Sequence, residues 1–139
     1  MKIIFDSKEK TVLAVEKGEE FFEVMNKFAK ERNKSFTFSA IGGCDMVELA
    51  YYSLEEKKYL TKEFSDTNIE IVTMTGNVAW YEGEPLIHTH GVFGGREYNT
   101  YGGHIMKLHI SATAEVMINW LSEKMERKMD KETCLKLLN

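Results

Sequence analysis

Most of this chain is patterned as a succession of β-strands, and this pattern limits its fold more than any other feature. Between residues 35 and 119, segments rich in β-branched and aromatic residues alternate with polar or glycine-containing breaks. The spacing of these breaks is typical of a meandering antiparallel sheet. The predicted strands are SFTFSAI, DMVELAYYS, KKYLTKEF, NIEIVTMTGNVAWY, EPLIHTHGVF, GGHIMKLHI and SATAEVMINW.

Alternation of apolar and polar residues is clearest in NIEIVTM. A period of two predicts that successive side chains point to opposite faces of the sheet. The predicted sets are Ile69, Ile71 and Thr73 on one face, and Glu70, Val72 and Met74 on the other.

The two ends of the chain differ from this middle part. KIIF (residues 2–5) and TVLAV (11–15) predict two short strands joined by a polar turn. In EKGEEFFEVMNKFAKERN (16–33) the period becomes helical, and acidic residues gather in the first turn, where the helix dipole favours them. The charged tail from Ser122 predicts an irregular segment or a short helix that docks Leu135, Leu137 and Leu138.

The predicted fold class is α+β: a largely antiparallel sheet of about seven strands packed with one main helix. No repeat, linker or low-complexity segment divides the chain, so residues 1–139 are expected to form a single domain. A sheet of this size has edges that must be covered, closed or paired between subunits. An oligomer would satisfy that requirement.

Composition limits the classes of partner and compartment. The net charge is −4, with 18 basic against 22 acidic residues, and the basic segments are interleaved with acids. That pattern favours solvated helix faces over a nucleic-acid footprint. No apolar run approaches the ~18 residues of a membrane span, and MKIIFDSKEK does not have the pattern of a secretory signal. Cys44 and Cys134 lie far apart in the sequence and form no CxxC motif. This usage is typical of reduced thiols, and we expect a cytoplasmic protein.

The segment HTHGVFGGREYNTYGGH, residues 88 to 104, holds three of the four histidines. Strand alternation projects His88 and His90 to the same face. A hairpin centred near Glu97 would set His90 opposite His104, because each lies seven residues from that centre. Three imidazoles around one point are a usual arrangement for zinc with an open fourth position. A register shift of one residue would instead send His104 to the other face.

For the three histidines, and for two glutamates elsewhere in the chain, a structural role remains an open alternative. The three histidines also fit hydrogen-bonded or half-exposed positions of an ordinary sheet. Glu115 and Glu70 are candidate carboxylates near the site, either as a fourth ligand or as a base for a metal-bound water, but each also fits a solvent-facing strand position. His109 falls on the opposite face from His104, and Cys44 has no evident base partner.

An ordered series of motifs resembles a known family, the PPC (plants and prokaryotes conserved) domain. The series is IGGCDMVELAYYS, EIVTMTGNVAWYEGEPLIHTHGVFG, YGGHI and TAEVMI, and it covers roughly residues 10 to 120. The tail ERKMDKETCLKLL is also similar to the family's C-terminal ending. IGGCD and YEGEP depart from the family's G-x-G-small and D-G-x-P turns, but neither touches a candidate ligand.

The resemblance implies a strongly bent antiparallel sheet with a helix against it, assembled as a homotrimer. It implies that His88, His90 and His104 are ligands of a divalent metal, zinc foremost, in a cleft near a subunit boundary. Plant relatives carry AT-hook motifs with an R-G-R-P core that enters the DNA minor groove. This chain has no such core, and its single proline, Pro85, stands in EGEPL.

Three functions are consistent with these observations. The first is a metal-binding trimeric module whose cleft takes a small-molecule ligand or supports a reaction, with Glu115 or Glu70 to move protons. The second is a DNA-associated or regulatory protein, and the third is a non-catalytic assembly module with a structural metal. The residues favour the first, name no substrate and leave open whether the protein is an enzyme.

Overall fold

The structure, a computed structural model, describes residues 1–139 and contains one helix and eight strands. The elements are β1 (Lys2–Asp6), β2 (Lys10–Glu16), α1 (Phe21–Arg32), β3 (Phe36–Ser53), β4 (Lys58–Tyr81), β5 (Glu84–Gly94), β6 (Thr100–Trp120), β7 (Arg127–Met129) and β8 (Lys136–Leu138). Six strands form one antiparallel sheet in the order β1-β2-β6-β3-β4-β5. The predicted α+β class, with a largely antiparallel sheet and one main helix, is confirmed.

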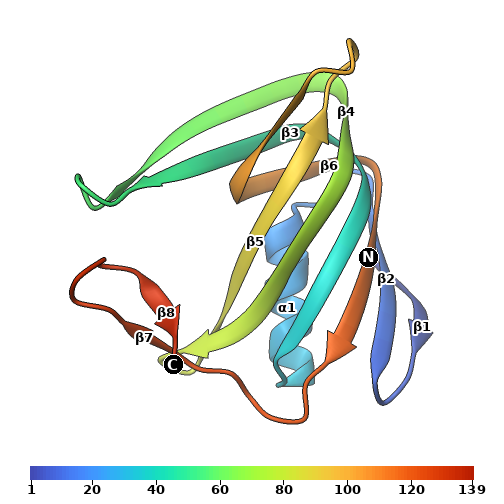
Figure 1. The fold of residues 1–139 in the computed structure, drawn as a ribbon. Helices are drawn as coiled ribbons and strands as arrows, with labels where there is room; N and C mark the ends of the chain where they lie inside the picture. The colour runs from blue at the N-terminus through green and yellow to red at the C-terminus, as the bar shows by residue number, and fades with distance from the viewer.

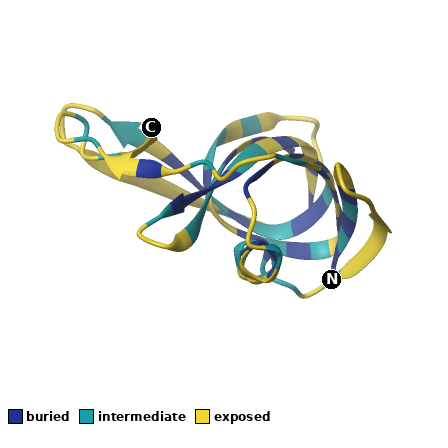
Figure 2. Ribbon diagram, turned by 90° about the horizontal axis from the view of Figure 1, so that it is seen from below, coloured by how far each residue is buried: buried dark blue, intermediate teal, exposed yellow.

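Pairing of β5 with β6 closes part of this sheet on itself. Since β6 also pairs with β3, and β4 pairs with both β3 and β5, four strands form a ring. Figure 1 shows α1 running along the curved sheet, and Figure 2 shows α1 end-on beside the ring, with buried and exposed positions alternating along the strands. Closure leaves β1 as the outer edge of the sheet.

The strands are longer and fewer than the sequence predicts. Strand β3 joins the two predicted segments SFTFSAI and DMVELAYYS. Strands β4 and β6 likewise each join two predicted segments. Irregularities in the pairing between Ala40 and Gly42, and between Cys44 and Met46, bend β3 without ending it. Gly42 has a φ of 152°, and a Cβ there would lie 2.0 Å from the Thr113 carbonyl oxygen, so the close approach of β3 to β6 requires glycine.

A further irregularity explains why the predicted alternation in NIEIVTM is wrong in part. Ile69 and Ile71 are both buried and so share a face as predicted, but the next buried residue is Met74, while Thr73 is exposed. The register between β4 and β5 shifts between Ile71 and Thr73. An extra residue at this point moves every later side chain to the other face.

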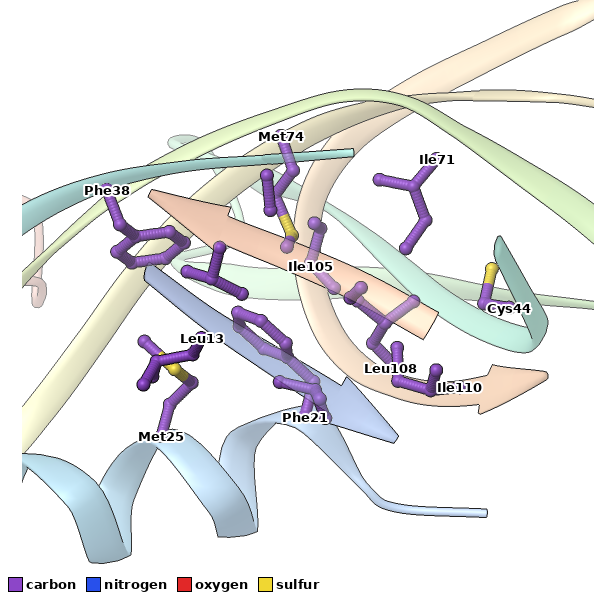
Figure 3. Packing of buried hydrophobic residues seen from close by; sticks show 14 of the residues in the cluster. Leu13, Phe21, Met25, Phe38, Cys44, Ile71, Met74, Ile105, Leu108 and Ile110 are labelled. Atoms are coloured by element: carbon purple, nitrogen blue, oxygen red, sulfur yellow. The ribbon is translucent and has the colours of Figure 1, made fainter. Parts of the chain in front are cut away.

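The core lies between α1 and the concave face of the sheet. Figure 3 shows Phe21 and Met25 of α1 directed toward Leu13 of β2, Phe38 of β3 and Leu108 of β6. The Glu20 carboxylate caps the helix by accepting a hydrogen bond of 2.8 Å from the Glu23 N–H. The histidines lie on β5 and β6, two of the strands that contribute residues to this core. The helix is too short and too polar to cross a membrane.

The C-terminal tail forms the β7–β8 hairpin, so the predicted irregular segment or short helix is wrong. Leu137 and Leu138 are 43% and 49% exposed rather than docked in the core. The Tyr52 hydroxyl donates to the Thr133 carbonyl oxygen at 2.5 Å and so ties the tail to the end of β3. In Figure 1 the tail lies below the long β3–β4 hairpin. This contact spans most of the chain, which is why local sequence patterns do not predict it.

Candidate metal centre

Three histidines converge on the β5–β6 hairpin. His88 and His90 lie on β5, and His90 is paired with His104 of β6, as the hairpin centred near Glu97 predicts. The candidate ligand atoms of the three rings all lie within 4.8 Å of one another, and the Nε2 atoms of His88 and His90 are 3.2 Å apart. Three imidazoles can therefore reach one ion from a single face of the sheet.

The surroundings of His88 and His104 favour the neutral form of these two rings. Burial lowers the pKa of His104 to about 4, and repulsion from His88 and His90 adds to the effect. Burial also lowers the pKa of His88, with repulsion from the Arg127 guanidinium as the next cause. Neutral imidazole is the form that binds a metal ion. The donor set therefore fits a divalent cation with a preference for nitrogen ligands, zinc among them.

A mostly apolar hollow of about 420 Å³ adjoins His88 and His104. The long β3–β4 hairpin contributes Tyr59, whose ring stacks on His104 with centroids 5.2 Å apart. The remaining lining comes from β5, β6 and the tail, namely Leu86, Ile87, Met106, Arg127, Met129, Cys134, Leu135, Lys136 and Leu137. The hollow is large enough for a small organic molecule beside a metal ion.

Arg127 is the residue of this region that the sequence does not point to. It is 7% exposed, and its guanidinium donates to the Asn77 side-chain oxygen at 2.7 Å and to the Lys136 carbonyl at 2.8 Å. Asn77 is the β4 residue paired with His88. Arg127 lies on β7 and lines the hollow beside His88 and His104 because the tail folds back. Only a prediction that the tail folds back could have identified Arg127 from the sequence.

The two candidate carboxylates do not join the histidines. Glu70 is paired with Gly94 at the far end of β5 and accepts a hydrogen bond of 2.8 Å from the Asn68 side chain. Glu115 is exposed on the other half of β6, between Ala14 and Ile41. The cluster that could hold a metal contains the three histidines alone.

His109, set aside by the sequence alternation, also lies apart from the cluster. Its Nδ1 is 2.6 Å from an Asp45 carboxylate oxygen, and that hydrogen bond raises the pKa of His109. This fourth histidine is therefore a natural control for experiments on the other three.

A known protein family matches most of this chain. The model of the Plants and Prokaryotes Conserved (PCC) domain matches residues 4–122. The chain belongs to this family. The resemblance of its motifs to the PPC domain, another abbreviation of the same name, is thereby confirmed. No curated protein sequence matches the chain significantly.

Solved structures share the fold over nearly their whole length. A plant- and prokaryote-conserved protein from Pyrococcus horikoshii is 27% identical with a TM-score of 0.87, covering 98% of this chain and 94% of its own. A metal-containing protein from Archaeoglobus fulgidus is 28% identical with a TM-score of 0.86, covering 100% of this chain and 99% of its own. A Bacteroides thetaiotaomicron protein to which DNA binding is ascribed is 22% identical with a TM-score of 0.93, covering 99% and 96%. The last of these shows the fold alone.

Proposed function

We propose that this protein is a metal-binding module that holds one divalent cation, zinc foremost, on His88, His90 and His104. The observation that carries the proposal is the convergence of three imidazoles with no acidic partner among them. His88 and His104 are half-buried, His90 is exposed, and the Nε2 atoms of His88 and His90 face each other at 3.2 Å. A metal ion between the rings would give a nitrogen atom of each imidazole a partner. The similar Archaeoglobus protein is described as metal-containing, which supports the same conclusion.

The surrounding residues fit a site that binds a small molecule. A zinc ion held by these three imidazoles would supply a Lewis acid beside the hollow, because three protein ligands would leave room for a further one. Tyr59 stacks on His104 and limits rotation of that ring, while the apolar lining of the hollow excludes water from a bound molecule. Glu70 and Glu115 lie outside this arrangement, so no carboxylate of this subunit is proposed as a base.

We further propose that the functional unit is the homotrimer implied by the family resemblance. Strand β1 is an outer edge, and its residues Ile3, Ile4 and Phe5 are 48%, 63% and 53% exposed. An exposed edge with apolar side chains is a typical subunit contact. The edge supports oligomerisation, while the number of subunits comes from the resemblance.

The proposal is tested by measuring bound metal and oligomeric state together. Wild-type protein, His90→Ala and the control His109→Ala are each incubated with zinc, desalted and measured by elemental analysis and light scattering. We expect about one zinc per chain in the wild type and in His109→Ala, and a trimer in all three. His90→Ala should lose the metal.

Two results would contradict the proposal in different ways. Equal zinc in all three proteins, or none in any, would leave the histidines as ordinary sheet residues. Loss of the trimer in His90→Ala would assign the metal to assembly, the third function considered above.

DNA binding has a separate test: affinity for duplex DNA should stay weak even at low salt, because the net charge is −4.

A further inference from the structure

The side chain of Arg127 is a buried positive charge with no negative partner. Its residue is 7% exposed, and both of its hydrogen bonds go to neutral oxygen atoms, on Asn77 and Lys136. Its Nε–H has no hydrogen-bond partner. A guanidinium stays protonated even where burial lowers its pKa, as burial does here. A buried charge without a counter-ion is costly, so such a residue in a protein calls for an explanation.

The location of Arg127 indicates what the missing partner is. It lines the hollow beside His88, whose pKa its charge lowers. The lining contains Arg127 and Lys136 as charged groups and no aspartate or glutamate. A metal ion on the histidines would make the same hollow still more positive. An anionic group entering the hollow would compensate both charges.

The shape of the hollow limits the anion further. At about 420 Å³, with eight hydrophobic residues among its twelve, it suits a small molecule with an apolar body. Leu86, Met106 and Leu135 provide the apolar surface, and the planar guanidinium fork matches a carboxylate. An inorganic anion would leave the apolar part of the hollow without contacts.

We propose that Arg127 is the anion-binding residue of this hollow, and that the ligand is a small organic carboxylate with an apolar body. The guanidinium holds the carboxylate, and the apolar body lies against the leucine and methionine side chains. The inference deepens the proposed function, on which it rests for the role of the adjacent metal. Because the tail carries Arg127, the β7–β8 hairpin becomes part of the binding site rather than an appendage of the fold.

The test is isothermal titration of benzoate, with neutral benzamide as the matched control ligand, at constant ionic strength. Wild-type protein, zinc-loaded and metal-free, is compared with Arg127→Met and with Lys136→Met. Lys136 lines the same hollow, but its ammonium lies over the Tyr81 ring, 4.3 Å from the centroid. Circular dichroism and thermal melting establish that each variant is folded, and Arg127→Lys replaces Arg127→Met if the latter does not fold.

We expect benzoate to bind wild-type protein and benzamide to bind at least about tenfold more weakly, since a hydrogen bond to a charged group contributes that much. Arg127→Met should weaken benzoate binding by about tenfold or more, Arg127→Lys should also weaken it, and Lys136→Met should change it by less than about threefold. Equal affinity for benzoate in wild type and in the Arg127 variants, or no binding to folded zinc-loaded wild type, would overturn the proposal.

The metal-free protein separates this inference from the proposed function. Benzoate binding that depends on Arg127 in a protein that takes up no zinc would uphold the carboxylate site while refuting the metal centre. Zinc binding without any benzoate binding would do the reverse.

Discussion

The β5–β6 hairpin depends on a close approach between two backbones, and Gly102→Ala is the substitution that tests it. A Cβ on Gly102 would lie 2.6 Å from the Gly91 carbonyl oxygen, a distance that real Cβ contacts essentially never reach, since they begin near 3.0 Å. The obstructing atom belongs to the backbone of β5, so no side-chain rotation can relieve the clash. The strands must separate within the short ladder that also pairs His90 with His104.

The size of the effect follows from that separation. Overpacking of this kind costs about 1–3 kcal/mol of unfolding free energy. For a domain of this length, that loss lowers Tm by about 4–12 °C. Displacement of His104 should weaken zinc binding by about tenfold, as the loss of supporting residues around metal ligands does. Differential scanning calorimetry and competition with a zinc-binding dye measure the two quantities.

Gly94→Ala is the control on the same hairpin. A Cβ there would meet the end of the exposed Val72 side chain at 3.3 Å, which can move, and the Glu70 Cβ at 3.7 Å, an ordinary van der Waals contact. We expect Gly94→Ala to retain the wild-type zinc affinity and nearly the wild-type Tm. If Gly102→Ala also retains both, the close backbone approach does not set the position of the histidines, and this reasoning is refuted.

Three further predictions concern the rest of the molecule. The hydrogen bond to Asp45 raises the pKa of His109 above its unfolded value, so the stability it contributes is present below about pH 6.5 and is lost as pH rises through the folded pKa. Urea unfolding should therefore show Asp45→Asn to be less stable than wild type at pH 6 but not at pH 9, and an equal difference at both would contradict the assignment. Phe93 is fully buried, so Phe93→Ala should lose about 3–5 kcal/mol in urea unfolding, and a loss below about 1 kcal/mol would show that the core rearranges around it. Burial raises the pKa of the Cys44 thiol to about 12, while Cys134 is exposed, so a thiol reagent should label one cysteine in native protein and two in urea; rapid native labelling of Cys134→Ser would contradict this.

Features set by local pattern could be predicted from the sequence. The change from period two to helical period marked the helix, and equal spacing of His90 and His104 about Glu97 gave the correct register of the hairpin. Both depend only on residues close together in the chain. The same holds for the cluster of three histidines, because the hairpin alone brings them together.

Features set by long-range contacts could not be predicted in this way. The irregularity beyond Ile71 inverts the faces of β4, and it shows only in the register of β4 against its two neighbours, β3 and β5. Glu70 and Glu115 were plausible carboxylates by residue type, but their places along β4 and β6 separate them from the histidines. Arg127 joins the site only because the tail folds back beneath the β3–β4 hairpin.

X-ray absorption spectroscopy of the zinc-loaded protein tests the central claim most directly, because it reports the atoms bound to the metal. We expect nitrogen or oxygen neighbours at about 2.0–2.1 Å, and outer-shell scattering from three imidazole rings that falls to two or fewer in His104→Ala. A shell of oxygen atoms without imidazole scattering, or a sulfur neighbour at about 2.3 Å, would contradict it.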